Sequence, residues 1–149
     1  MRFRQVHLDF HTCEDIDNIG GEFSREQFQA CLKMGHVDSI TLFSKCHHGW
    51  AYHPSRANKM HPNLHFDLLR EQISAAHELG IKTPVYLSAG FDERIARVRP
   101  EWLLRNKDQT VAWTADFTTP GYHRFCYNTG YLDYLLDQVA EVCANYDAD

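Results

Sequence analysis

Apolar and polar residues repeat along this chain with two different periods, and segments of the two kinds follow each other in turn. Three short runs of apolar and β-branched residues are bounded by polar turns, as is typical of strands. Three longer runs carry apolar residues three or four positions apart, as is typical of amphipathic helices. The strands are expected at Arg4–Phe10, Asp38–Phe43 and Lys82–Leu87, and the helices at Arg25–Met34, Phe66–Leu79 and Thr129–Asn145.

Local signals support the bounds of the first two helices. Ser24 stands where a capping side chain is needed, and Gln27 follows three residues later, a spacing typical of a capping box. Gly35 and Gly80 each follow the last periodic position of a helix, where glycine commonly ends the segment. The polar stretch that holds Arg94, Arg97 and Arg99 shows no comparable pattern, and we expect a solvated loop there.

The alternation of strands and helices predicts an α/β fold. Strands that are separated by helices and lie side by side in one sheet must run parallel. Their carboxyl ends then share one edge, which is where parallel α/β sheets bind their ligands. No low-complexity linker or internal repeat divides the chain, so residues 1–149 are expected to form one domain.

Composition narrows the class of protein further. The 149 residues are 44% hydrophobic and 13% aromatic, enough to bury one core, and the formal charge of −5 argues against a nucleic-acid partner. The N-terminal residues contain no apolar run long enough for a signal peptide or a membrane span. Five cysteines without a CxxC pair indicate reduced thiols, so the expected location is cytoplasmic.

The most informative segment follows the second predicted strand, where Lys45, His47, His48 and Trp50 stand close together. Imidazoles and an indole at a strand end are well placed to meet a polar ligand. His11 follows the first predicted strand, and Tyr86 lies near the end of the third. The topology therefore predicts a polar ligand site built from these three strand ends.

These segments resemble a known family. The run Lys45–Ala51, with Ser55 after it, is similar to the Lys-His-His-Asp-Gly-Phe-Ala pattern of alpha-L-fucosidases, which also has a later Ser. His11 matches the early His of that family, and Gly80–Ser88 matches its third strand. Pro100–Leu103 and His123–Asn128 resemble fucosidase-like glycosyl hydrolases, some of which carry a beta-galactosidase-type trimerisation domain.

The resemblance implies the N-terminal portion of a (β/α)8 barrel glycosidase that binds a carbohydrate substrate without a cofactor. By position, His11 and His47 would hydrogen-bond sugar hydroxyls, and Trp50 stands where the family has Phe. Lys45, His48 and Tyr86 are the other expected substrate-binding residues. Cys46 and His48 depart from the family pattern, which has His and Asp at these positions, so the sugar that is bound stays open.

The catalytic pair is expected to be incomplete. Retaining glycosidases use two carboxyl groups about 5 Å apart. The resemblance places the nucleophile beyond Asp149, so we expect the chain to be inactive alone. The carboxylates expected near the site are Asp9, Glu14, Asp15, Asp92 and Glu93.

Two other functions are compatible with the sequence. His7, Asp9, His11 and the Cys46–His48 segment could supply ligands to a metal-dependent barrel hydrolase. A non-catalytic sugar-binding or assembly module is the second alternative. An incomplete barrel leaves strand edges unpaired, so self-association, or a place in a larger parent chain, is expected.

Overall fold

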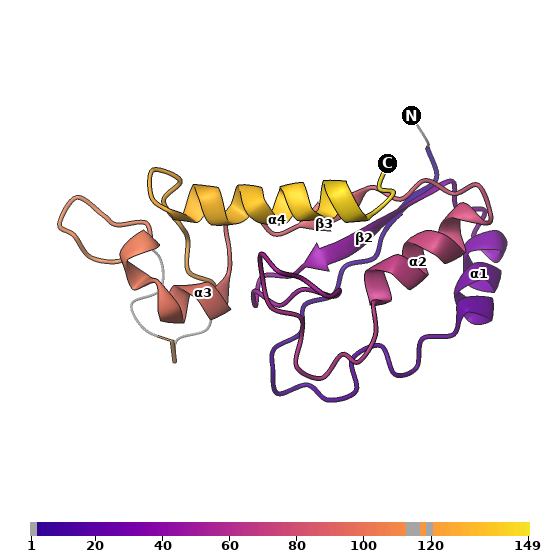
Figure 1. Ribbon diagram of the computed structural model, residues 1–149, viewed down its shortest axis with the longest axis horizontal. Helices are drawn as coiled ribbons and strands as arrows, with labels where there is room; N and C mark the ends of the chain where they lie inside the picture. The colour runs from indigo at the N-terminus through magenta and orange to yellow at the C-terminus, as the bar shows by residue number, and fades with distance from the viewer. Residues whose placement is uncertain (1–2, 113–116, 119–120) are drawn as a thin grey trace.

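The computed structural model describes residues 3–112, 117–118 and 121–149. In this part of the chain three strands form one parallel sheet in the order β1-β2-β3. The strands are β1 (Gln5–His7), β2 (Ser39–Lys45) and β3 (Val85–Leu87). The sheet confirms the predicted parallel α/β arrangement, and the carboxyl end of β2 points toward the side of the molecule where α3 (Glu93–Val98) lies (Figure 1).

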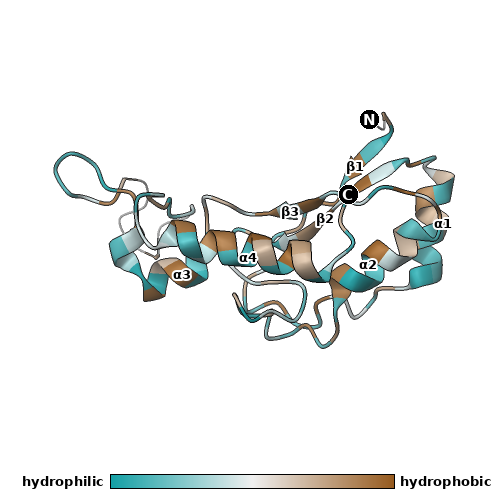
Figure 2. Ribbon diagram, turned by 45° about the horizontal axis from the view of Figure 1, so that its top comes forward, coloured by the Kyte–Doolittle hydropathy of each residue, from teal (hydrophilic) through white to brown (hydrophobic). Residues whose placement is uncertain are grey.

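The central strand forms the middle of the core. All seven residues of β2 are buried, whereas all three of β1 are exposed, in keeping with the largely hydrophilic colouring of β1 in Figure 2. Side chains alternate along a strand. Ile40 and Leu42 therefore join the cluster that contains Leu69 and Ile73, while Phe43 belongs to a second cluster with Tyr52.

Three long helices accompany the sheet: α1 (Arg25–Met34), α2 (Leu68–His77) and α4 (Tyr131–Asn145). The predicted bounds of α1 are confirmed at both ends, and Ser24 accepts a hydrogen bond from the amide of Gln27 at 3.2 Å. The end of α1 differs from the prediction in its backbone: Gly35 stays in the right-handed region, and His36 takes the left-handed conformation with φ +50°. The other two helices begin two residues later than predicted, and α2 also ends two residues earlier.

A fourth helix corrects the sequence analysis. The stretch expected as a loop contains α3 and the short 3-10 helix Pro100–Trp102. Asp92 caps α3 by accepting a hydrogen bond from the amide of Ile95 at 2.9 Å. Ile95 and Ala96 pack into a cluster with Tyr131 and Leu135 of α4. Packing against a distant helix, which local periodicity does not reveal, holds this short helix in place.

Candidate functional site

The two histidines that follow β1 and β2 lie against each other. The rings of His11 and His47 are 4.2 Å apart between centroids and tilted by 32°. The backbone amide of His47 donates to Nδ1 of His11 at 3.2 Å, and Nε2 of His11 lies 2.9 Å from a carboxylate oxygen of Asp9. Because Nδ1 of His11 accepts, the neutral ring carries its proton on Nε2 and donates it to Asp9.

His47 also bonds to a residue that follows β3. Its Nδ1 lies 2.6 Å from the hydroxyl oxygen of Ser88, which donates to the carbonyl of Phe91 at 3.1 Å. The Ser88 proton points to that carbonyl, which can only accept, so Nδ1 of His47 is the donor. Nε2 of a neutral His47 is then an acceptor. The ends of all three strands thus meet at one imidazole.

Burial keeps the His47 and His48 side chains uncharged over a wider pH range. It lowers the pKa of both imidazoles from the ordinary value of 6.5, and the nearby His11 lowers them further. Neutral imidazole offers one donor and one acceptor, which suits the recognition of hydroxyl groups.

Aromatic rings border the histidine pair. The ring of Tyr86 lies 6.4 Å from that of His47 and packs on Phe43 at 4.4 Å between centroids. Burial raises the pKa of the Tyr86 hydroxyl, which keeps it protonated at neutral pH. Phe91 and Tyr122 approach His47 edge-on, at 4.9 and 5.0 Å. His11, His47 and Tyr86 therefore come together as the topology predicts, although their roles stay a prediction.

His48 and Trp50 each have side-chain partners of their own. Nε2 of His48 is 3.4 Å from the Tyr122 hydroxyl, and the indole N–H of Trp50 donates to Glu14 at 3.2 Å. Arg94 lies over the Trp50 ring at 5.7 Å. The indole is therefore held between an acidic and a basic side chain.

Lys45 occupies a different environment from the other predicted residues. Its side chain and that of Asp92 are both 0% exposed, and Lys45 Nζ lies 2.9 Å from Asp92 Oδ2. The Tyr134 hydroxyl donates to the same carboxylate oxygen at 3.2 Å. Burial lowers the pKa of Lys45 more than the neighbouring carboxylate raises it. The ammonium group points into the protein, and contact between Lys45 and a sugar stays a prediction.

The buried pair joins β2 to α3 next to the histidines. The amides of Glu93 and Arg94 donate to the carbonyls of His47 and His48 at 3.0 and 3.1 Å. Gly49 passes so close to Asp92 that an added Cβ would lie 2.1 Å from Oδ1. This contact and the positive φ of 93° explain why glycine stands at this position in the motif.

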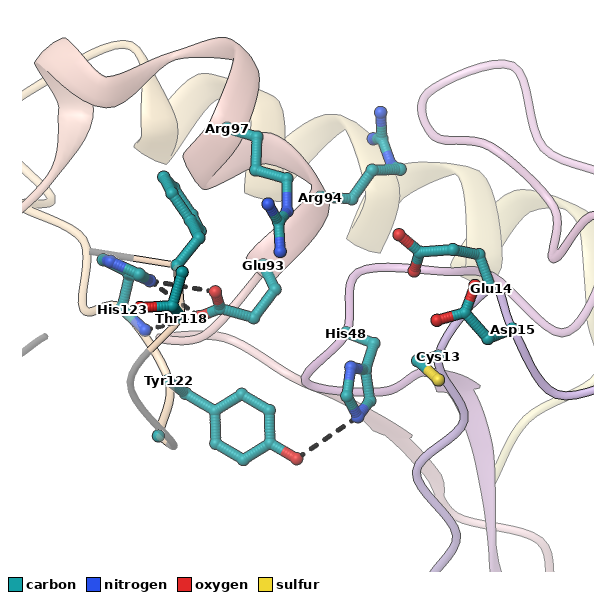
Figure 3. Close-up of a pocket in the computed structure, with 12 residues that line it drawn as sticks. Cys13, Glu14, Asp15, His48, Glu93, Arg94, Arg97, Thr118, Tyr122 and His123 are labelled. Carbon is teal, nitrogen blue, oxygen red and sulfur yellow. Dashed lines mark hydrogen bonds and ion pairs between the residues drawn. The ribbon is translucent and has the colours of Figure 1, made fainter.

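A pocket of about 290 Å³ opens beside His48 (Figure 3). Its lining includes Glu14 and Asp15 from the loop after β1, Arg97 from α3, and Tyr122. Of the six predicted substrate-binding residues, only His48 lines this pocket. Tyr122 was not identified from the sequence, because it lies in a long segment without periodicity. Ser88 lies within Gly80–Ser88, the segment that matches the third strand of the fucosidases.

Comparison with known proteins now places the chain. Residues 24–149 match the family described as hypothetical glycosyl hydrolase 6. This chain belongs to that family. The match, together with the 57% identical structure described next, confirms the predicted membership of a fucosidase-like group of glycosyl hydrolases.

Solved structures agree with this assignment. Alpha-L-fucosidase isoenzyme 2 from Paenibacillus thiaminolyticus is 57% identical with a TM-score of 0.97, over 100% of this chain and 23% of that protein. Thermotoga maritima alpha-fucosidase with a mechanism based inhibitor is 22% identical, with a TM-score of 0.63 over 91% of this chain and 30% of its own. The first match confirms the predicted part of a barrel, and the second shows the fold alone. No curated protein matches the chain.

Two further observations bear on other classes of function. Within residues 3–112, 117–118 and 121–149, no three His, Cys, Asp or Glu side chains are grouped so that they could hold a metal ion. Among the helices of the described residues, none combines the length and the apolar character needed to cross a bilayer.

Proposed function

We propose that residues 1–149 form one partial barrel domain that supplies the sugar-binding side of a glycoside hydrolase, with the sugar at the carboxyl ends of the strands. The observation that carries this proposal is the contact of His11 with His47 and of His47 with Ser88, which brings three strand ends together. Nε2 of His47 is the acceptor left for a sugar hydroxyl. Tyr86 supplies a ring beside it, of the kind that packs on the apolar face of a pyranose.

L-Fucose is the sugar that we propose for this site. Support comes from the 57% identity to a protein named as an alpha-L-fucosidase. The two departures from the motif leave the histidine pair unchanged: the Cys46 side chain is buried, and His48 points to Tyr122. The bound sugar is therefore expected to contact His11 and His47.

We further propose that the chain alone does not hydrolyse fucosides. Four of the five carboxylates expected near the site are engaged within the chain: Asp9 with His11, Glu14 with Trp50, Asp92 with Lys45 and Glu93 with His123. Hydrolysis with retention needs one nucleophilic carboxylate and one acid/base. Incubation with an aryl α-L-fucoside should release no phenol above background.

Self-association and a cytoplasmic location are also part of the proposal. Leu132, Leu136 and Val139 are exposed large hydrophobic side chains at helical spacing on α4, a patch that favours contact with another protein surface. Light scattering should detect species larger than a monomer.

The cysteines bear on the proposed cytoplasmic location. All five are free, as expected in a reducing compartment.

The sugar site is tested by titrating the chain with L-fucose and following its imidazole and amide signals by NMR. We expect shifts at His11 and His47, and loss of binding in His47→Ala. His65→Ala is the matched control, because His65 is exposed in the loop before α2. Unchanged fucose affinity in His47→Ala would contradict the proposal.

A further inference from the structure

Ser88 follows the third strand and is completely buried. It is 0% exposed, and its backbone amide donates to the carbonyl of Lys45, the last residue of β2, at 3.1 Å. The next carbonyl along the chain, that of Ala89, accepts hydrogen bonds from the hydroxyl groups of Tyr127 and Tyr131 at 2.6 and 3.0 Å. The backbone is therefore held at Ser88 and directly after it, which gives the Ser88 hydroxyl group a fixed position.

This hydroxyl group links the His47 ring to a backbone carbonyl. It donates its single proton to the carbonyl of Phe91 at 3.1 Å, and its oxygen lies 2.6 Å from Nδ1 of His47. An oxygen that has already donated its proton can only accept from the imidazole, so it favours the tautomer with the proton on Nδ1. Among the described residues, no other group bonds to this nitrogen. Ser88 therefore sets the tautomer of His47.

The other ring nitrogen of His47, Nε2, is left for a ligand. Burial lowers the pKa of His47 from 6.5, so the ring is neutral at neutral pH and Nε2 is an acceptor. In the part of the chain that the structure describes, Nε2 has no hydrogen-bond partner. Both ring nitrogens of His11, in contrast, have partners, the His47 amide and Asp9. The histidine pair therefore offers one free nitrogen, and that nitrogen can only accept.

We propose that Ser88 is a specificity-determining positioning residue: it fixes His47 as a hydrogen-bond acceptor, so that the site selects a ligand with a free hydroxyl group at this point. The inference rests on the proposed function and deepens it. A hydroxyl group donates to Nε2, whereas a fluorine or an ether oxygen in its place leaves two acceptors facing each other. A site built around one hydroxyl group rejects analogues that lack it, because its own polar group is then left unpaired.

The tautomer is tested first, without any sugar, by NMR of the imidazole nitrogens in the full chain at neutral pH. We expect the signals of a protonated Nδ1 and an unprotonated Nε2 at His47. Ser88→Ala removes the acceptor for Nδ1–H, so the tautomer with the proton on Nε2 should become populated.

Ser44→Ala is the matched control. Ser44 is also buried, and its hydroxyl oxygen lies 2.9 Å from Nε2 of His53, whose Nδ1 lies 2.9 Å from the carbonyl oxygen of Pro54. This variant loses a buried serine–histidine hydrogen bond of the same kind. It should leave the His47 signals unchanged.

The selectivity is tested by titrating the chain with L-fucose and with its analogues that carry fluorine in place of the hydroxyl group at C2, C3 or C4. In the wild-type chain at least one analogue should bind about tenfold more weakly than fucose. In Ser88→Ala the ring can turn an N–H group toward the fluorine, and the same analogue should bind within about threefold of fucose. A purely structural loss would weaken fucose and the analogue by the same factor. Ser44→Ala should keep the wild-type ratio.

The outcomes separate this inference from the proposed function. A His47 ring that carries its proton on Nε2 in the wild-type chain, or that keeps Nδ1–H in Ser88→Ala, overturns the inference whatever binds. If fucose shifts the His47 signals and each analogue keeps its wild-type ratio to fucose in Ser88→Ala, the inference is wrong and the sugar site stands. If Ser88→Ala changes the tautomer and no sugar shifts the His47 signals, the positioning role of Ser88 is supported and the proposed sugar site is wrong.

Discussion

Replacing Lys45 with methionine tests how the motif after β2 is held in place. The ion pair with Asp92 is 0% exposed on both sides, and its charges are 2.9 Å apart. Met has a similar length but no charge, so the Asp92 carboxylate would keep only its contacts with Ile95 and Tyr134. Removing one partner of a buried pair costs about 3–5 kcal/mol, a large part of the 5–15 kcal/mol that stabilises a typical domain.

The double variant Lys45→Met with Asp92→Asn shows whether the unpaired charge causes this loss. Asn keeps an oxygen to cap α3 while both charges are removed. Burial lowers the pKa of Lys45 despite its partner, so the pair positions the loop more than it stabilises the fold. We therefore expect the double variant to recover about 2 kcal/mol or more relative to Lys45→Met.

Urea unfolding followed by far-UV circular dichroism measures both effects. With a slope of about 2 kcal/mol per molar, the midpoint of Lys45→Met should fall by about 2 M. Arg4→Met breaks the ion pair with Asp38 on the surface and is the matched control, with a much smaller change. A Lys45→Met midpoint equal to that of Arg4→Met, or a double variant no more stable than Lys45→Met, would refute this reasoning.

Two further predictions concern the same loop. Gly49→Ala places a Cβ 2.1 Å from Asp92 Oδ1 and should cost about 2–4 kcal/mol, whereas Gly80→Ala, with positive φ but no atom within 4 Å, should cost about 1–2 kcal/mol; equal urea midpoints would contradict the contact. The pKa of His47 and His48 is lowered in the fold, so the unfolded chain binds more protons below pH 6.5, and stability should fall as pH drops from 6.5 through the folded pKa. A pH series of urea unfolding checks this. A free energy of unfolding that increases as the pH is lowered from 6.5 would contradict the prediction.

The sequence predicted those parts of the fold that local signals determine. The bounds of α1 follow from the Ser24 cap and an apolar face with helical spacing, and both are observed. Parallel pairing follows from the alternation of strands and helices. The short helix α3 was missed because its buried residues, Ile95 and Ala96, are only two, and they are flanked by arginines. Its packing on α4 is a contact between distant segments.

The candidate site likewise has a part that the sequence predicted and a part that it did not. Topology was sufficient to bring His11, His47 and Tyr86 together, because each lies near or beyond the carboxyl end of a strand of one parallel sheet. It could not show that Lys45 is buried, since its partner Asp92 lies 47 positions away in the sequence. The place of Tyr122 beside His47 likewise depends on a segment without a periodic pattern.

A crystal structure of the chain soaked in L-fucose tests the central claim most directly. The account predicts a pyranose at the carboxyl ends of the strands, with one hydroxyl within hydrogen-bond distance of His47 Nε2 and Tyr86 beside the ring. A sugar that binds elsewhere while the histidine pair contacts only solvent would contradict it.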